Sequence, residues 1–486
     1  MGIQAGIREP GAAGSSGSVA ARLNRLPPTA IHRHATFIAG IGSFFDLFDI
    51  FLAGVLATVL TQQFHLTRAA LPPIIGSSFI GMFFGATLLG RFADARGRRT
   101  AFLVNLGIYS AFTLLGAFSP NVTALIVTRF LAGIGIGAEL PLVDAYLSEL
   151  LPARHRGRYT AWAYTLGFVG VPAAGFLARI LVPQQPLGID GWRWMFVAGS
   201  LGAAIIWVLR AKLPESPRWL ESVGRTAEAE AIVSRMEREA ERLGALPEPS
   251  PDEVVSEERG RFRTIFGPRY RGRTLMLCVF HVFQTVGYYG FGTLVPTVLA
   301  AKGYSVVTTL TFTSLTFIGY PIGSALSLPM VERVDRRWLI VGSAALMAVF
   351  GLTLGYASAP AMILASGFLY TATSNIFSNA LHIFQVEIFP TFARATAAGT
   401  AYGMSRLSTG AMPFVLVPVL DRFGPGAMFG VVAGALAICI VDIALFAPPT
   451  TGRALEAIAL SGIRDQGSGS GTAELGSGKR GRRILH

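Results

Sequence analysis

Apolar stretches of about 20 residues recur along the chain, with short polar segments between them. A helix of this length crosses the hydrocarbon core of a bilayer, so the pattern predicts about twelve transmembrane helices. We expect six of them at residues 35–60, 73–92, 101–119, 122–143, 160–182 and 193–211. We expect the other six at residues 274–300, 308–330, 338–357, 361–387, 395–420 and 426–447. The predicted fold class is an all-α membrane protein.

The polar segments divide the chain into five parts. Residues 35–211 and 274–447 are the two six-helix bundles, and residues 212–273 are a cytoplasmic linker. The linker stretch RTAEAEAIVSRMEREAERL has the charge pattern of a helix on the protein surface. Residues 1–34 and 448–486 are rich in small and polar residues, so we expect them to be disordered cytoplasmic tails.

Arginine gathers in the loops at one side of the predicted helices. The loops RFADARGRR, ARHRGR and VERVDRR follow the second, fourth and eighth helices, whereas AFSPN and YASAP on the other side contain no arginine. Cytoplasmic loops carry the excess of basic residues in membrane proteins. We therefore expect a multi-pass protein of the inner (plasma) membrane with both termini in the cytoplasm.

Composition supports this class and argues against several others. The chain is 52% hydrophobic, has a mean hydropathy of +0.52, and has only 14% charged residues, against about 25% in soluble domains. The net charge of +13 comes largely from the loops, so nucleic acid is not an expected partner. The sequence has no P-loop, metal-ligand spacing or nucleophile elbow, so we expect neither an enzyme nor an ATP-driven pump. The expected partners are a small-molecule substrate and the lipid bilayer, the chain is expected to be monomeric, and no metal or cofactor is expected besides a proton as coupling ion.

Two local patterns repeat at the same distance along the chain. Asp94 and Glu332 begin similar arginine-rich loops and are 238 residues apart, and Glu149 and Glu387 begin similar E-x-x-P-x-x-x-R motifs, again 238 residues apart. One offset shared by unrelated patterns indicates two halves in parallel order. This is a known transporter plan, with the binding site near the membrane midplane between the halves.

Four motifs show a resemblance to a known family. GRFADARGRR (90–99) resembles the loop signature of the major facilitator superfamily, and YLSELLPARHRG (146–157) matches the YxxExxPxxxRG pattern of its sugar-porter-like branch. PESPRWL (214–220) is typical of that branch, and PPTTGRALEAI from Pro448 resembles its PETKGRSLEEI, with Pro449 and Thr451 as departures. The resemblance covers nearly the whole chain and implies a secondary active transporter of two six-helix pseudo-repeats.

Other stretches indicate which members of this branch the chain resembles most. RFLAGIGIGAELPL (129–142) and GWRWMF (191–196) are most similar to bacterial metabolite–proton symporters for nicotinate and aromatic acids. FQTVGYYG (283–290) departs from the QQxSG stretch of sugar porters, and GAELP (137–141) departs from the GGDYP of phosphate symporters. The resemblance therefore implies metabolite transport, with hexose and phosphate disfavoured.

Ionisable residues inside predicted membrane helices are candidates for function, because each is costly to bury unless it is paired or faces water. At a rise of about 1.5 Å per residue, Asp49 and Arg129 lie at similar depth, so we expect them to form an ion pair. Asp46 is less well placed for Arg129 and is the better proton carrier. Glu139, deeper on the fourth helix, is a second candidate for the proton or for substrate, and Pro141 is expected to break that helix locally. The alternative is a structural ion pair with no transport role.

The second half offers neutral and basic groups instead. His281, Gln284 and Tyr288 share one helical face, as do Asn375, Asn379 and His382. Arg406 lies about 16 Å into the eleventh helix, where it could bind a carboxylate in bidentate fashion. We expect Gln284, Tyr288, Asn375, Asn379, His382 and Arg406 to bind substrate, with Tyr288, Tyr289 and Phe291 available to pack on a ring. The alternative is that these polar faces are contacts between helices.

A third group of residues is expected to form a cytoplasmic gate of exchangeable ion pairs. We expect Asp94 to pair with Arg98 and Arg99, Glu149 with Arg156, and Glu387 with Arg394, while Asp144 binds the basic loops. The complete predicted gate comprises Gly90, Asp94, Gly97, Arg98, Arg99, Asp144, Glu149, Arg156, Glu332, Arg336, Glu387 and Arg394. A purely topological role would explain the arginines but not the acids.

These observations predict proton-coupled uptake of a small organic anion, an aromatic or other monocarboxylate, by alternating access. Three alternatives remain open at this stage. They are a sugar or polyol porter, a proton-driven exporter of small compounds, and a membrane sensor that binds ligand without transport.

Overall fold

The structure is a computed structural model that describes residues 18–66, 70–248, 265–268, 270–389 and 391–448. Ten helical stretches among these residues are long and apolar enough to cross a membrane. One of them, residues 399–446, contains a break at Gly424 and so includes parts of two predicted spans. A further long helix, Pro360–Glu387, occupies the predicted span 361–387. The predicted all-α architecture of two six-helix halves is confirmed.

In the described part of the N-terminal half, nine helices make up the first six predicted spans. The first span is α2 (Ala30–Val55) with α3 (Ala57–Gln63), and the next two are α4 (Leu71–Arg96) and α5 (Arg98–Ala117). The fourth is α6 (Val122–Gly137) with α7 (Glu139–Leu150), the fifth is α8 (Ala153–Phe168) with α9 (Gly170–Leu181), and the sixth is α10 (Gly191–Arg210). A short 3-10 turn, η2 (Pro186–Gly188), precedes α10.

The C-terminal half repeats this plan. Its spans are α13 (Arg271–Ala301), α14 (Val306–Phe317) with α15 (Gly319–Arg333), α16 (Arg336–Tyr356) and α17 (Pro360–Glu387), followed by α18 (Thr391–Ala411) and α19 (Pro413–Phe446). The eleventh predicted span is α18 with the first part of α19, and the twelfth is the rest of α19, so the turn expected between them at residues 421–425 is present. The turn itself is at Gly424, whose φ of 81° lies in the left-handed region that glycine tolerates, and Pro425 follows it.

Three spans are broken at positions that proline explains. The breaks at Ala138, Val169 and Ile318 each precede a proline, Pro141, Pro172 or Pro321, by three residues. Proline lacks the amide hydrogen and its ring clashes with the carbonyl of the preceding turn, so the helix is interrupted just before it. The local break expected from Pro141 is therefore present, and it separates Arg129 on α6 from Glu139 on α7.

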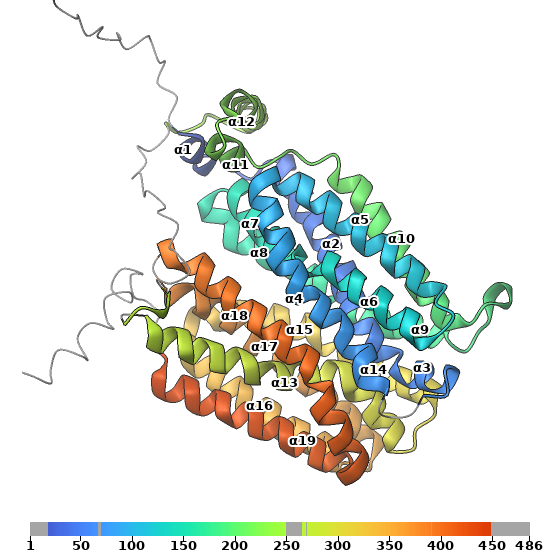
Figure 1. Cartoon of the computed structure of the whole chain (residues 1–486). Coiled ribbons are helices and arrows are strands. Elements are labelled where there is room, and N and C mark those ends of the chain that lie inside the picture. The colour runs from blue at the N-terminus through green and yellow to red at the C-terminus, as the bar shows by residue number, and fades with distance from the viewer. Residues whose placement is uncertain (1–17, 67–69, 249–264, 269, 390, 449–486) are drawn as a thin grey trace, which may run out of the picture.

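Figure 1 shows the two halves side by side, the N-terminal half in blue to green and the C-terminal half in yellow-green to red. Helix α4 packs against α18, and α9 packs against α14. The helices α1 (Val19–Asn24), α11 (Pro217–Ser222) and α12 (Thr226–Glu241) lie at one end of the N-terminal half (Figure 1). We call this end, which also carries the arginine-rich loops, the basic end.

The two halves approach most closely away from the basic end, where three glycines lie in the interface. A Cβ atom at Gly54 would lie 2.5 Å from the carbonyl oxygen of Thr293, and one at Gly76 would lie 2.5 Å from that of Gly410. A Cβ atom at Gly175 would lie 2.6 Å from the hydroxyl of Ser314. Any larger residue would push the helices apart, so glycine at these positions lets the halves close on each other.

The segment before the first span is more ordered than the sequence suggested. We expected residues 1–34 to be a disordered tail, but residues 18–34 include α1 and the start of α2, while residues 1–17 lie outside the described part. Arg22 forms ion pairs with Glu230 (2.6 Å) and Glu237 (2.5 Å) of α12, and Arg25 pairs with Glu237 at 2.6 Å. Because both partners are on α12, the predicted surface helix of the linker anchors the N-terminal segment.

Candidate functional site

The predicted pair of Asp49 and Arg129 is present between α2 and α6. Nη1 of Arg129 donates to both carboxylate oxygens of Asp49, at 2.9 and 2.7 Å, and Nη2 donates to the Asp49 carbonyl at 3.0 Å. Nη2 also reaches the Ser78 hydroxyl at 3.3 Å, and the guanidinium lies 5.7 Å from the ring centre of Phe196. Both charged side chains are almost fully buried. Several bonds to one guanidinium hold the Asp49 carboxylate in a single position.

Asp46 lies one turn away and is in a different environment. Its side chain is fully buried, and neither carboxylate oxygen has a hydrogen-bond partner among the described residues. The charged groups that act on it are Arg210 and Asp49. Burying an ionised carboxylate in such surroundings costs far more than burying a protonated one. Asp46 and Asp49 therefore have different surroundings, and the expected difference in their roles stays a prediction.

Glu139 pairs with an arginine that the sequence analysis did not select. Arg210, the last residue of α10, forms an ion pair with Glu139 at the start of α7, and both side chains are buried. The guanidinium passes over Gly42 of α2, where an added Cβ would lie 2.0 Å from Nη2, and stacks 4.1 Å from the ring centre of Phe102. From its place in the sequence, Arg210 resembles the other arginines at the ends of spans. The one sequence feature that accommodates the buried arginine is the glycine at position 42. It cannot be interpreted from the sequence, because its role depends on the contact between α2 and α10.

Gly42→Ala is expected to break this arrangement. The new methyl group overlaps the end of the guanidinium, which must shift, and because both partners are buried, weakening the Arg210–Glu139 ion pair costs up to about 3 kcal/mol. We expect a lower melting temperature of the purified protein and loss of transport. Gly107→Ala on α5 is the matched control, because its Cβ would have no neighbour closer than 3.9 Å. Equal melting temperatures for the two variants would contradict this account of Gly42.

The polar faces of α13 and α17 are largely occupied within the C-terminal half. The Tyr288 hydroxyl donates to the side-chain oxygen Oδ1 of Asn375 at 3.0 Å, and Nδ2 of Asn375 donates to the backbone carbonyl of Tyr320 at 2.5 Å. Asn379 donates to the hydroxyl of Ser327 on α15 at 2.7 Å. Asn375 and Asn379 therefore hold helices together, which was the alternative to substrate binding.

The remaining members of these faces lie at different depths. His281 bonds to Gln385 of α17 through Nε2 at 3.0 Å, and Gln284 is buried one turn further along α13. His382 is exposed, and its Nδ1 bonds to the Ser378 carbonyl of its own helix at 2.7 Å. Phe291 stacks on Tyr370 with ring centres 4.1 Å apart inside the C-terminal half, so the expectation that Phe291 packs on a ligand ring is not supported by its position.

Arg406 is a deeply buried cation of the C-terminal half, and no acid lies beside it among the described residues. It is 2% exposed, donates to the Tyr289 hydroxyl at 2.8 Å, and contacts the Tyr402 hydroxyl with its other terminal nitrogen. Its guanidinium lies over both rings, 5.2 Å from the centre of Tyr289 and 4.4 Å from that of Tyr402. Among the described residues, no carboxylate lies within ion-pair distance of Arg406. A buried guanidinium with only neutral partners is a candidate site for an anion.

Aromatic side chains from both halves meet next to Arg406. Tyr289 stacks on Phe51 of α2 with ring centres 6.2 Å apart and meets Phe79 of α4 edge-on at 5.2 Å. Tyr320 of α15 lies parallel to Phe168 of α8 at 6.4 Å. These five aromatic residues, which we call the interface cluster, join α2, α4 and α8 to α13 and α15. Arg406 therefore lies beside aromatic surfaces that suit packing against the ring of a ligand.

The predicted gate residues form ion pairs, but partly with other partners than expected. Arg98 pairs with Asp94 at 2.7 Å, as predicted, and with Glu149 at 2.9 Å. We expected Glu149 to bind Arg156, and no such pair is found in the described part of the chain. The carboxylate of Glu149 at the end of α7 points to the start of α5, so the arginine after α4 reaches it first.

The second half repeats this contact. Arg336 pairs with Glu387 at 3.3 Å, and each of these residues is 238 positions after its counterpart in the Arg98–Glu149 pair. The expected partner Arg394 and the gate residue Glu332 have side chains outside the described part. Because both pairs join helices of the same half, they brace the basic end of each half and do not bridge the halves.

Three more gate residues have distinct surroundings. Gly97 has a φ of 99°, and a Cβ there would lie 2.3 Å from the Glu215 carboxylate, so this position requires glycine. Gly90 has open space around it. The backbone amide of Arg99 donates to Glu215 at 3.1 Å, and its side chain contacts the Ala211 carbonyl instead of Asp94.

Asp144 does not bind the basic loops. Its carboxylate accepts a hydrogen bond from Tyr164 of α8 at 2.7 Å, and the Tyr164 ring lies 6.5 Å from that of His382 on α17. Asp144 and His382 are 238 residues apart, so these counterparts in the repeat face each other across the interface near the basic end. Both are exposed, in contrast to the tight contact of the halves at the opposite end.

The chain is similar to a known protein family and to several transport proteins of bacteria. Residues 35–460 match the family described as sugar (and other) transporters. The chain is 32% identical to the putative metabolite transport protein YyaJ of Bacillus subtilis, over 90% of this chain and 96% of that protein. It is 30% identical to the niacin transporter NiaP of Acinetobacter baylyi, over 90% and 99%. It is also 30% identical to the gallate transporter of Pseudomonas putida, over 74% and 80%.

Solved structures show the same fold. The xylose transporter XylE from Escherichia coli, in a partially occluded inward open conformation, aligns with a TM-score of 0.73 at 21% identity, over 88% of this chain and all of that one. At this level of identity the likeness concerns the fold and not the substrate.

Proposed function

Because this chain belongs to the family of sugar and other transporters, we propose that it takes up a small organic anion together with a proton by alternating access. The anion is an aromatic or other monocarboxylate. The proposal places the basic end and both termini in the cytoplasm of a cell whose inner membrane holds the protein.

The observation that supports an anionic substrate most directly is the isolated charge of Arg406. A guanidinium buried without an acid is unfavourable, and a bound carboxylate would relieve this by accepting two parallel N–H bonds. Tyr289 and Tyr402 would steady the guanidinium in a fixed direction. The interface cluster around Tyr289 would cover the ring of an aromatic acid, and relatives named for niacin and gallate transport fit this class.

The buried charges of the N-terminal half support a proton as the coupling ion. Three acids, Asp46, Asp49 and Glu139, meet two arginines there, Arg129 and Arg210. Two of these acids pair with an arginine, whereas Asp46 pairs with none among the described residues, so one bound proton on Asp46 balances the cluster. With a monocarboxylate on Arg406, the loaded carrier then has no uncompensated charge in this cluster or at Arg406.

The contacts between the halves support movement around this site. The halves are held together at Gly54, Gly76 and Gly175 at the end opposite to the basic end, whereas Asp144 and His382 are exposed near the basic end. To open the site toward the other side of the membrane, the glycine contacts would have to separate, and α7 with Asp144 would have to approach α17 with His382. The Arg98–Glu149 and Arg336–Glu387 pairs would keep each half rigid during this rocking.

Uptake into proteoliposomes tests the proposal. We expect labelled nicotinate to accumulate when the interior is alkaline, about tenfold for each pH unit, because one unit corresponds to about 1.4 kcal/mol per proton. One proton with one monovalent anion carries no net charge, so a membrane potential set by potassium and valinomycin should have no effect. Gallate and benzoate extend the test to other carboxylates, and xylose represents the sugar alternative. Uptake of xylose alone, or accumulation of the acids that a protonophore leaves unchanged, would refute the proposal.

A further inference from the structure

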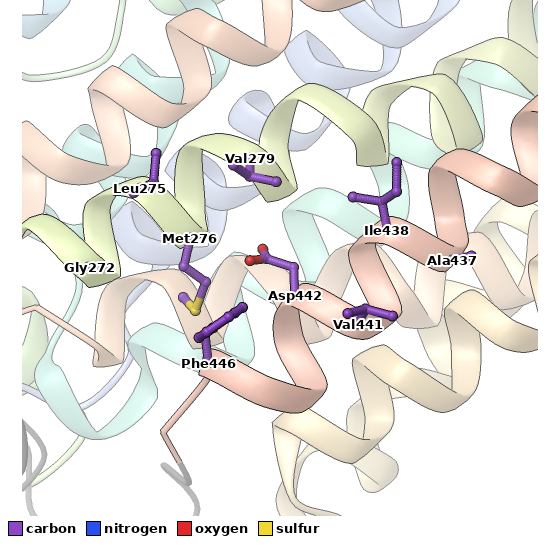
Figure 2. A pocket seen from close by; sticks show the side chains of 9 residues that line it. All are labelled: Gly272, Leu275, Met276, Val279, Ala437, Ile438, Val441, Asp442 and Phe446. Carbon is purple, nitrogen blue, oxygen red and sulfur yellow. The ribbon is translucent and has the colours of Figure 1, made fainter. Parts of the chain in front are cut away.

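A groove on the outside of the C-terminal half contains an acid that the transport mechanism does not use. It lies between α13 and α19, has a volume of about 610 Å³, and is lined by the side chains shown in Figure 2. This volume is within the range of about 300–1,000 Å³ that is usual for ligand sites. Leu275, Val441 and Phe446 in its walls are more than half exposed, as expected for side chains that face lipid.

Among the described residues that line this groove, Asp442 is the only charged one. It is 8% exposed, and its Oδ2 atom is buried and has no hydrogen-bond partner among the described residues. In Figure 2 its carboxylate points toward α13, between Met276 and Val279. All other described lining residues are apolar or glycine, so their side chains supply no donor to this carboxylate inside the groove.

The groove is close to the level of lipid headgroups. α13 begins at Arg271, one residue before the lining residue Gly272, and α19 ends at the lining residue Phe446. Asp442 is one turn before that end, about 6 Å deeper at the rise of a helix. An acid at this depth on a lipid-facing surface is expensive unless a cation meets it.

We propose that this groove binds a phospholipid whose headgroup carries a primary ammonium, such as phosphatidylethanolamine. The ammonium donates hydrogen bonds to the Asp442 carboxylate, and one acyl chain lies along the exposed apolar walls formed by Leu275, Ile438 and Val441. Charge complementarity selects this occupant. An anionic headgroup brings no cation to the carboxylate, and a quaternary ammonium has no N–H to donate. The site is separate from the substrate site at Arg406 and does not depend on the identity of the substrate.

Native mass spectrometry of the full-length protein, purified in detergent, tests this inference. The protein is titrated with phosphatidylethanolamine, phosphatidylglycerol or phosphatidylcholine of matched acyl chains, and the bound fraction is measured. We expect phosphatidylethanolamine to bind about tenfold more tightly than the other two, the effect of charge-assisted hydrogen bonds. Asp442→Asn should remove this preference.

A second pair of variants keeps the test decisive if Asp442→Asn is poorly produced. Ile438→Trp fills the groove and should reduce binding of phosphatidylethanolamine, while Leu445→Trp, at an exposed position on α19 that does not line the groove, should leave it unchanged. Equal binding of the three lipids to the unaltered protein would overturn the proposal. So would a preference that survives in Asp442→Asn or in Ile438→Trp.

Discussion

Asp46→Asn is expected to convert a carrier that concentrates its substrate into one that only equilibrates it. The variant leaves two acids and two arginines in the buried cluster of the N-terminal half, so the cluster is balanced without a proton. At a difference of one pH unit across the membrane, the accumulation of nicotinate should fall from about tenfold to about one. Exchange of labelled for unlabelled nicotinate should continue, because Arg406 and the interface cluster are unchanged.

The control for this prediction is Asp49→Asn. That change removes the partner of Arg129 and leaves a buried guanidinium unpaired, which costs about 3–5 kcal/mol. We therefore expect Asp49→Asn to lower the melting temperature, whereas Asp46→Asn keeps it near that of the unaltered protein. Concentrative uptake in Asp46→Asn would remove this residue from the coupling role, and Glu139 would become the next candidate.

Arg406→Gln is expected to abolish recognition of the carboxylate. Removing one partner of a buried charged pair costs at least about 2 kcal/mol, so binding of nicotinate should weaken by roughly 30-fold or more. Isothermal titration calorimetry of the purified protein with nicotinate measures this directly. Nicotinamide is a matched ligand with the same ring and no charge, and its weak binding should change little.

Two further variants, Arg406→Lys and Tyr402→Phe, distinguish the effect of the positive charge on nicotinate binding from the effect of the hydrogen-bond geometry. The lysine keeps the positive charge but cannot donate two parallel hydrogen bonds, so we expect an intermediate loss of nicotinate affinity. Tyr402→Phe removes one hydroxyl beside the guanidinium and should have a smaller effect than Arg406→Gln. A neutral sugar as the true substrate would be indicated if Arg406→Gln transported normally.

Much of the site was accessible from the sequence because depth in a membrane helix is proportional to residue number. This relation placed Asp49 level with Arg129, and the structure contains that pair. The same reasoning separated Asp46 from Arg129 and put Arg406 well inside the membrane. The 238-residue offset predicted two equivalent halves, and it recurs in the Arg98–Glu149 and Arg336–Glu387 contacts.

Other features of the site depend on which helices are in contact, and the local sequence does not indicate those contacts. Arg210 has the sequence context of a loop arginine, and only the packing of α10 against Gly42 of α2 turns it inward to Glu139. Glu149 is close in sequence to Arg156 but binds Arg98, because the start of α5 is adjacent to the end of α7. The face shared by Asn375 and Asn379 was predicted correctly, yet their bonds go to α13 and α15 and not into the interface.

The sequence by itself therefore determined the membrane class, the two halves and the depth of each buried charge, since these follow from hydropathy, repetition and helical rise. The tertiary structure decided which charge meets which. It assigned an arginine to Asp49 and another to Glu139, left Asp46 without one, and surrounded Arg406 with tyrosines. The physical reason is that pairing depends on distances of a few ångströms between helices far apart in the chain, and those distances are set by small residues such as Gly42 at the helix contacts.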